Sequence, residues 1–244
     1  MSDSASSQGK RILIVASNPA VSEQTGWPIG FWWAELTHPY WEFVQQGYEV
    51  TIASPDGGVI AADGFSDPED ASGYSASDIL SLGFKKSPSH SALLESTARL
   101  GDLDPGDFDA VMFIGGQGPM YTFKGNPVVN HAIAQFYEAG KPTALVCHAT
   151  CALLDARGSD GRLIVEGKTW TGFSNEEEGQ ADAYVGQKIQ PYWIEDEARK
   201  ISGTRFVVGP AFLPFAHRDG NLITGQQQFS GAQAARVVIA ALEE

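Results

Sequence analysis

Short apolar runs alternate with segments of helical periodicity along most of the chain. β-branched and other apolar residues dominate these runs, and each run ends in glycine, proline or a polar residue, a pattern that predicts buried strands. The predicted strands of the first two thirds are residues 11–17, 48–54, 108–116 and 141–147. Residues 34–47 and 127–140 repeat apolar positions with helical spacing and end in glycine, so they predict helices. Pro39 lies inside the first of them and marks either its first turn or a kink.

The last third continues the pattern, whereas one internal segment interrupts it. Further strands are predicted at residues 168–173, 205–209 and 221–225, with a closing helix over 229–242. Between residues 61 and 106 the periodicity weakens, and glycine, serine, aspartate and proline become frequent. We interpret residues 61–106 as a cap-like excursion with a short helix around 90–100.

Strands that alternate with helices predict an α/β fold, because a parallel sheet needs helical crossovers on its faces. We expect a doubly wound, mostly parallel sheet with helices on both faces, formed by one domain over residues 11–244. Residues 1–10 are polar and are expected to be a flexible tail. Ligands are expected at the carboxyl ends of the strands.

Composition narrows the range of partners and compartments. The chain has 244 residues, 43% of them hydrophobic, which is enough for a sizeable core. A formal net charge of −14 repels phosphate backbones and anionic lipids, so we expect neither nucleic acid nor a membrane as a partner. The two cysteines lie four residues apart and cannot form a useful disulfide framework. A cytoplasmic protein is expected.

The stretch TALVCHATCALLDA places Cys147 where a strand ends and a helix is predicted to begin. Nucleophiles of α/β enzymes occupy such an elbow, and the helix N-terminus there favours a thiolate. A small buried hydrophobic residue is the alternative for Cys147. Cys151, one turn later, is expected in the core. His148 can lie beside Cys147 and orient it or exchange a proton with it.

The stretch IGGQGP ends another predicted strand. Its glycines allow backbone N–H groups to approach a ligand, and the lysine of a phosphate-binding loop is missing. Together with Cys147 it suggests an oxyanion hole made by one N–H near Gly116 and one at His148. No second Cys/His pair has zinc spacing, so no metal is expected.

Two acidic features complete the candidate site. Glu35 lies in the apolar stretch IGFWWAELTHP and is either an exposed helix charge or a buried acid with a raised pKa. The run Glu176–Glu177–Glu178 is typical of a solvated loop, and at most one of its members can orient His148 as the third residue of a triad.

Taken together, these stretches resemble the DJ-1/PfpI superfamily, and within it the Hsp31-like branch that includes the glutathione-independent glyoxalases. The resemblance extends over residues 10–242 and includes IGFWWAELTHP, GYEVTIASPDGG, FIGGQGPMYTF, ALVCHATCALL, EGKTWTGFSNEEE and DGNLITGQQQFSGA in family order. It implies a class I glutamine amidotransferase-like fold, no cofactor and a homodimer.

The resemblance also implies roles for individual residues. Cys147 is the implied nucleophile, Glu178 the triad acid, and Glu35 the buried acid that hydrogen-bonds the cysteine. A one-residue gap would move the triad acid to Glu176 or Glu177. Gly116, Gln117 and His148 correspond to the oxyanion and substrate-binding positions. The chain departs from its relatives at Gln117, where a histidine is usual, in C-H-A-T-C for C-H-G-P-A, and at residues 226–228, which are Gln-Gln-Gln for Asn-Pro-Ala.

The function implied is that of a cofactor-free glyoxalase III-like enzyme, which converts a small 2-oxoaldehyde such as methylglyoxal into lactate through a cysteine hemithioacetal. Two alternatives remain open from the sequence. One is a stress chaperone or cysteine redox sensor without a dedicated substrate. The other is a PfpI-like peptidase or amidohydrolase.

Overall fold

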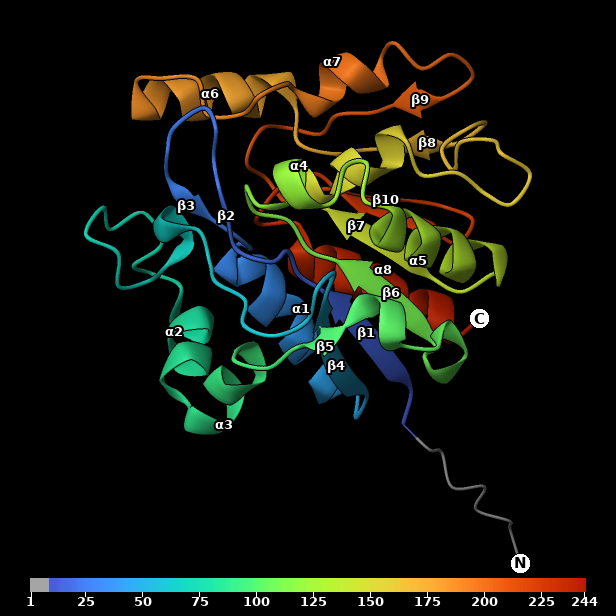
Figure 1. Cartoon of the computed structure of the whole chain (residues 1–244), viewed down its shortest axis with the longest axis horizontal. Coiled ribbons are helices and arrows are strands. Elements are labelled where there is room, and N and C mark those ends of the chain that lie inside the picture. Colours follow the sequence, from blue (N-terminus) through green and yellow to red (C-terminus); the bar gives the residue numbers. More distant parts are fainter. Residues whose placement is uncertain (1–8) are drawn as a thin grey trace, which may run out of the picture.

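The computed structural model describes residues 9–244. The predicted flexible tail, residues 1–10, therefore lies almost wholly outside the described residues. The described chain forms a central sheet with helices on both faces and a smaller layer above its carboxyl edge (Figure 1).

The central sheet has seven strands in the order β10-β11-β7-β6-β1-β4-β5. Their bounds are β1 (Arg11–Val15), β4 (Glu49–Ser54), β5 (Ala98–Arg99), β6 (Ala110–Phe113), β7 (Thr143–Val146), β10 (Ala216–Asp219) and β11 (Leu222–Gly225). Every neighbouring pair is parallel except β10 and β11, which form an antiparallel pair. The predicted α/β fold with a mostly parallel sheet is confirmed.

Three long helices cover the two faces of the sheet. Helix α1 (Trp33–Gln45) packs with α8 (Gly231–Leu242) on one face, and α5 (Pro127–Glu138) covers the other (Figure 1). Helix α1 connects β1 to β4, and α5 connects β6 to β7, in the opposite direction across the sheet. Because both crossovers are right-handed, the two helices must lie on opposite faces. The side chain of Asn126 accepts hydrogen bonds from the first turn of α5 and fixes its start. Pro39 lies inside α1 without ending it.

The remaining elements are short. The shorter helices are α2 (Ile79–Lys86), α3 (Pro88–Ser91), α4 (Pro119–Thr122), α6 (Asn175–Val185) and α7 (Ile194–Ala198). The 3-10 helices are η1 (Gly64–Ser66), η2 (Ala92–Leu94), η3 (Leu100–Asp102), η4 (Pro105–Asp107) and η5 (Cys147–Leu154). The short strands are β2 (Ala20–Val21) and β3 (Pro28–Ile29), which form a hairpin, and β8 (Thr169–Trp170) and β9 (Arg205–Phe206), which form a separate parallel pair.

Two local predictions were wrong, and two predicted strands form a separate small sheet. The helix predicted around residues 90–100 lies earlier, because Asp78 caps α2 by accepting a hydrogen bond from Ser81 N, and β5 occupies the end of that stretch. The strands predicted at residues 168–173 and 205–209 are present as β8 and β9, and they pair with each other outside the central sheet. The glutamate run opens α6 and is not a solvated loop.

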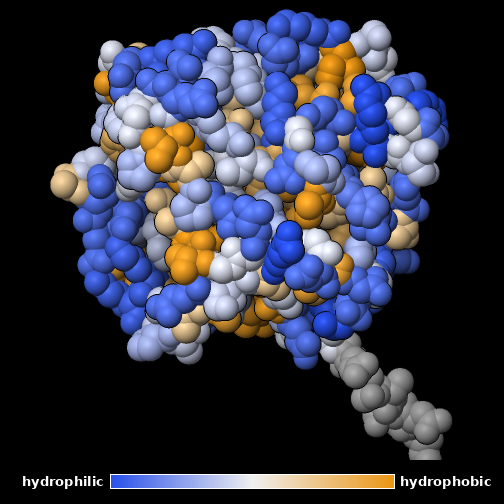
Figure 2. Space-filling view, in the orientation of Figure 1, coloured by the Kyte–Doolittle hydropathy of each residue, from blue (hydrophilic) through white to orange (hydrophobic). Residues whose placement is uncertain are grey.

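The central strands of the sheet are mainly apolar because helices cover both of its faces. Strands β6 and β7 and most of β1 are fully buried. The surface in Figure 2 is mainly hydrophilic, with apolar side chains in small separate groups. Within residues 9–244, no helix combines the length and the hydropathy needed to cross a membrane.

Candidate active site

Cys147 stands on a sharp turn between β7 and η5. Its φ is +56°, a left-handed backbone conformation that a non-glycine residue rarely adopts. The hydroxyl of Thr150 donates a hydrogen bond of 2.6 Å to the carbonyl of Cys147 and supports the turn. Among residues 9–244 the other non-glycine residue with positive φ is Phe212, and both line the same cavity. Backbone strain at such positions is typical of functional sites.

The side chains of Cys147, His148 and Glu178 form a linear hydrogen-bonded series. The Sγ atom of Cys147 lies 3.3 Å from Nδ1 of His148, and Nε2 of His148 lies 3.0 Å from Oε1 of Glu178. All three residues are buried, and Phe173 stacks on the imidazole with ring centroids 4.2 Å apart. A carboxylate at Nε2 favours the tautomer with its proton there, which leaves Nδ1 free to accept the thiol proton.

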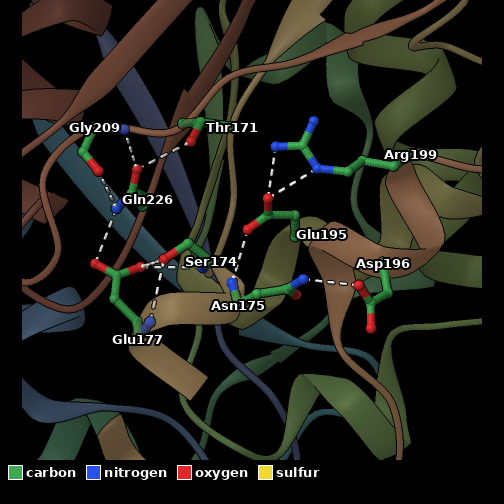
Figure 3. A network of polar contacts seen from close by, with 9 residues as sticks. All are labelled: Thr171, Ser174, Asn175, Glu177, Glu195, Asp196, Arg199, Gly209 and Gln226. Carbon is green, nitrogen blue, oxygen red and sulfur yellow. Dashed lines mark hydrogen bonds and ion pairs between the residues drawn. The ribbon is translucent and has the colours of Figure 1, made fainter. Parts of the chain in front are cut away.

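The other two glutamates of the run face elsewhere. Glu177 closes a capping box with Ser174, and its Oε1 accepts a hydrogen bond from Gln226 Nε2 (Figure 3). The same Oε1 also accepts from Phe212 N. Glu176 is exposed and accepts from Gln180 Nε2. Of the three candidates, Glu178 is therefore the one that contacts His148.

Figure 3 also shows how this turn is anchored. Gln226 Oε1 accepts from Gly209 N at 2.7 Å, while Glu195 accepts from Asn175 N at 2.7 Å and pairs with Arg199. The network ties the start of α6 to α7 and to the loop after β11. This network fixes the start of α6 and thereby the position of Glu178 beside His148.

Glu35, on the first turn of α1, is fully buried on the other side of Cys147. Its Oε2 accepts a hydrogen bond of 2.8 Å from Gly115 N. Oε1 has no hydrogen-bond partner of acceptable geometry, although the Cys147 thiol lies close enough to affect the carboxyl pKa. Burial raises the pKa of Glu35 to about 8, against smaller lowering effects of Cys147 and Gly115.

The sequence predicts a Cys147 thiolate, whereas the structure favours the protonated thiol. Burial first, and then the charge of Glu35, raise the pKa of the Cys147 thiol well above its ordinary value. The backbone N–H groups of His148 and Gly116 interact with the sulfur and lower that pKa. Burial outweighs them because the thiol is only 2% exposed. The resting sulfur is a thiol that must lose its proton to a neighbour.

The glycine-rich loop after β6 fits between Glu35 and the elbow. A Cβ atom at Gly115 would lie 2.8 Å from Glu35 Oε2 and 2.9 Å from Cys147 Cβ. Gly116 has φ of +108°, and a Cβ there would lie 2.6 Å from Trp32 N. The absence of side chains lets the N–H of Gly116 reach the sulfur.

Asp63, which the sequence did not single out, fixes this loop. Its Oδ1 accepts from Gly30 N at 2.8 Å and its Oδ2 accepts from Gln117 N at 2.6 Å. Burial raises the pKa of Asp63 to about 7, and the charge of His148 lowers it. No local pattern predicts this contact, because the two N–H groups come from distant segments.

A cavity of about 240 Å³ opens in front of Cys147. Gly116, Gln117, His148 and Glu178 all line it. The structure thus brings together every residue that the sequence proposed for the site, with Glu35 behind the sulfur and outside the cavity lining. Cys151 is buried in the core, as expected, and burial raises its pKa to about 12.

No metal site accompanies these residues in the described part of the chain, where no three His, Cys, Asp or Glu side chains are placed to share an ion. His38, one turn after Glu35 in α1, hydrogen-bonds Asp78 at 2.9 Å.

The parallel sheet, with a cysteine on a strained turn at a strand end beside a hydrogen-bonded histidine and glutamate, defines an α/β protein with a candidate nucleophile site. The chain belongs to the DJ-1/PfpI family, which residues 30–240 match. It is 24% identical over 238 residues to Glyoxalase 3 from Candida albicans, covering 96% of this chain and 98% of that protein. It is 26% identical over 246 residues to the glutathione-independent glyoxalase HSP31 of Saccharomyces cerevisiae, covering 96% and 98%.

A solved structure shares the fold. Rapid Encystment Protein 24 KDa from Francisella tularensis superposes with a TM-score of 0.84 at 24% identity, covering 96% of this chain and 99% of that one. The predicted membership of the DJ-1/PfpI superfamily and the likeness to its Hsp31-like branch are confirmed.

Proposed function

We propose that the protein is a glutathione-independent glyoxalase that converts a 2-oxoaldehyde, with methylglyoxal as the simplest case, into a 2-hydroxy acid. The observation that carries the proposal is the position of the Cys147 sulfur between two proton-handling groups, His148 on one side and Glu35 on the other. The names of the fungal relatives, which include glyoxalases from two genera, support the same activity.

The first step is attack of sulfur on the aldehyde carbon. The thiol proton moves to Nδ1 of His148, whose other nitrogen faces Glu178. The new oxyanion lies near the N–H groups of Gly116 and His148, and each such donor is worth about 2.7–4 kcal/mol in other enzymes. His148 then returns its proton to this oxygen, and a neutral hemithioacetal results.

The second step moves a proton from the first carbon to the second. Neutral His148, which lines the cavity, removes the proton from the first carbon, which gives an enediolate, and returns it to the second carbon. An imidazole can accept and return a proton near neutral pH. The hydroxyl proton at the first carbon moves to the oxygen on the second carbon, which leaves the thioester of the 2-hydroxy acid on Cys147.

In the last step, water attacks the thioester with His148 as base, which releases the 2-hydroxy acid and restores the thiol. The sum is one aldehyde and one water converted into one acid, so neither a redox partner nor a cofactor is required.

The test is the loss of methylglyoxal without added glutathione, followed together with lactate formation. Wild type should turn over, and Cys147→Ala should lose activity by at least about a thousandfold. Cys151→Ala is the matched control, because it removes the other buried thiol without touching the cavity. Unchanged turnover in Cys147→Ala, or none in wild type, would contradict the proposal.

The two alternatives fit the site less well. A redox-sensing cysteine is usually exposed with a lowered pKa, whereas Cys147 is buried and its pKa is raised. A peptidase needs room for an extended chain on both sides of the scissile bond, and the cavity at Cys147 has the size of a small ligand.

We further propose that the protein works in the cytoplasm as a homodimer. Both cysteines are free thiols, the state that a reducing compartment maintains. The homodimer rests on the family resemblance alone, and analytical ultracentrifugation measures it directly.

A further inference from the structure

Aromatic side chains dominate the cavity at Cys147. Five of them contact one another in a single group, which we call the aromatic cluster: Trp27, Trp32, Phe65, Tyr74 and Tyr184. Ring centroids within the cluster lie 5.6–6.4 Å apart. These are spacings at which edge-to-face contacts are favourable.

The cluster is assembled from three parts of the chain. Trp27 belongs to the turn between β2 and β3, whose tip rises towards α6 (Figure 1). Tyr74 comes from the segment that precedes α2, and its hydroxyl accepts a hydrogen bond of 3.1 Å from Gln228 Nε2. Tyr184 comes from α6 and remains 64% exposed at the cavity mouth. Tyr74 is 41% exposed, so both tyrosines of the cluster are accessible to a ligand in the cavity.

Cationic side chains are missing from the lining: within residues 9–244, no lysine or arginine lines this cavity. The chain carries a formal net charge of −14, which also repels anions from its surface. A carboxylate or phosphate on the ligand would therefore lose its hydration without gaining a counter-charge. The site favours a neutral ligand.

Two glutamine side chains that line the same cavity have amide oxygens without a hydrogen-bond partner. Oε1 of Gln117 and Oε1 of Gln190 are buried without a hydrogen-bond partner, in residues that are 8% and 1% exposed. Burial of an unpaired polar atom is unfavourable, so these amides mark positions where a ligand's polar groups bind. Gln117 adjoins Gly116, at the reacting end of the cavity.

The cavity is larger than methylglyoxal needs. Its 240 Å³ corresponds to about eight water molecules at roughly 30 Å³ each, whereas methylglyoxal has five non-hydrogen atoms. The space left beyond the reacting carbons is bordered by the aromatic cluster.

We propose that this cavity selects a neutral ligand with an aromatic ring. Building on the proposed glyoxalase function, the preferred substrate class is a 2-oxoaldehyde whose ketone carbon bears an aryl group. The aldehyde faces Cys147, the oxygens of the intermediate meet the Gln117 amide, and the ring lies against Tyr74 and Tyr184. Tyr184 and Tyr74 are then specificity-determining residues, and the methyl group of methylglyoxal leaves them uncovered.

The kinetic test compares phenylglyoxal with methylglyoxal without glutathione. Wild type should give a kcat/KM at least about tenfold higher for phenylglyoxal, since apolar pocket contacts discriminate by such factors. Tyr184→Ala should lower that value by about fivefold and change methylglyoxal turnover by less than about twofold. Glu176→Ala, exposed on the same helix and outside the cavity, should change neither. Equal wild-type values for the two aldehydes, or equal losses in Tyr184→Ala, would overturn the assignment.

A binding test separates ring selection from turnover. Mandelamide, lactamide and mandelate are titrated calorimetrically into the Cys147→Ser protein. Mandelamide should bind at least about tenfold more tightly than ring-free lactamide or anionic mandelate. Similar affinities for mandelamide and lactamide would overturn the proposal. If neither aldehyde is turned over but the mandelamide preference is present, the glyoxalase function fails while the ring-selective cavity is supported.

Discussion

Nε2 of His148 lies 3.0 Å from Oε1 of Glu178, inside a site where both side chains are buried. The carboxylate at this nitrogen determines which ring nitrogen faces the Cys147 thiol as a base. Glu178 stands in the first turn of α6. The tautomer of His148 therefore depends on the contacts that fix the start of this helix.

Replacement of Glu178 by glutamine should lower kcat by about 10²–10⁴-fold, because an amide can present its NH₂ to Nε2 and favour the wrong tautomer. KM should change little, since the substitution preserves the size of the side chain. Steady-state kinetics with the best 2-oxoaldehyde measures both.

Glu176→Gln is the matched control, as it makes the same chemical change two residues away on an exposed position. It should retain wild-type kinetics. Activity in Glu178→Gln within about twofold of wild type would remove the proposed role of the carboxylate.

Glu177→Ala should reduce stability. The carboxylate of Glu177 is buried and accepts hydrogen bonds from the Ser174 hydroxyl, Phe212 N and Gln226 Nε2. Each buried donor left without a partner costs about 1–3 kcal/mol, so the free energy of unfolding should fall by at least about 3 kcal/mol. Urea denaturation measures it, and Glu176→Ala should remain near wild type.

The sheet was predictable because burial on both faces makes β1, β6 and β7 continuously apolar. The short elements could not be predicted, for a physical reason. Strand β10 is a half-buried edge with the sequence AHRD, and α2 begins with exposed Ile79 and Leu80. Neither has a periodicity that separates a buried from an exposed face.

The site was predictable where one residue's chemistry coincides with a strand end, as at Cys147 and His148. The choice between Glu177 and Glu178 required the helix, although the spacing of Ser174 and Glu177 is a capping-box signal that assigns Glu177 to the cap. Asp63 could not be predicted, because its partners are the backbone N–H groups of Gly30 and Gln117, and backbone groups carry no sequence signature.

Stability should depend on pH through Glu35. Its pKa is raised from 4.5 in the unfolded chain to about 8 in the folded protein. Its stabilising contribution is therefore complete below about pH 4.5 and is lost as pH rises through about 8, because the unfolded chain releases the proton first. Glu35→Gln lacks this loss.

The unfolding free energy of Glu35→Gln minus that of wild type should thus increase by roughly 2 kcal/mol as the pH rises from about 5.5 to about 7.5. Denaturant unfolding of both proteins at constant ionic strength gives the difference at each pH. A difference that stays constant, or one that falls with pH, would contradict a raised pKa for the buried carboxyl.

Gly115→Ala should inactivate the enzyme through the contact between Glu35 and the elbow. The added methyl group would lie 2.8 Å from Glu35 Oε2 and from the carbonyl of Val146, and 2.9 Å from Cys147 Cβ, so at least one of them must move. We expect a loss of kcat of at least about a hundredfold, since small displacements of catalytic groups have effects of that size.

Gly179→Ala is the control: it lies within α6, and nothing would approach its Cβ within 4 Å. It should keep full activity and gain about 0.5–1 kcal/mol of stability, because alanine restricts the unfolded chain more than glycine does. Parallel kinetics and thermal unfolding of both variants decide the matter, and an active Gly115→Ala protein would show that the spacing between Glu35 and Cys147 is not critical.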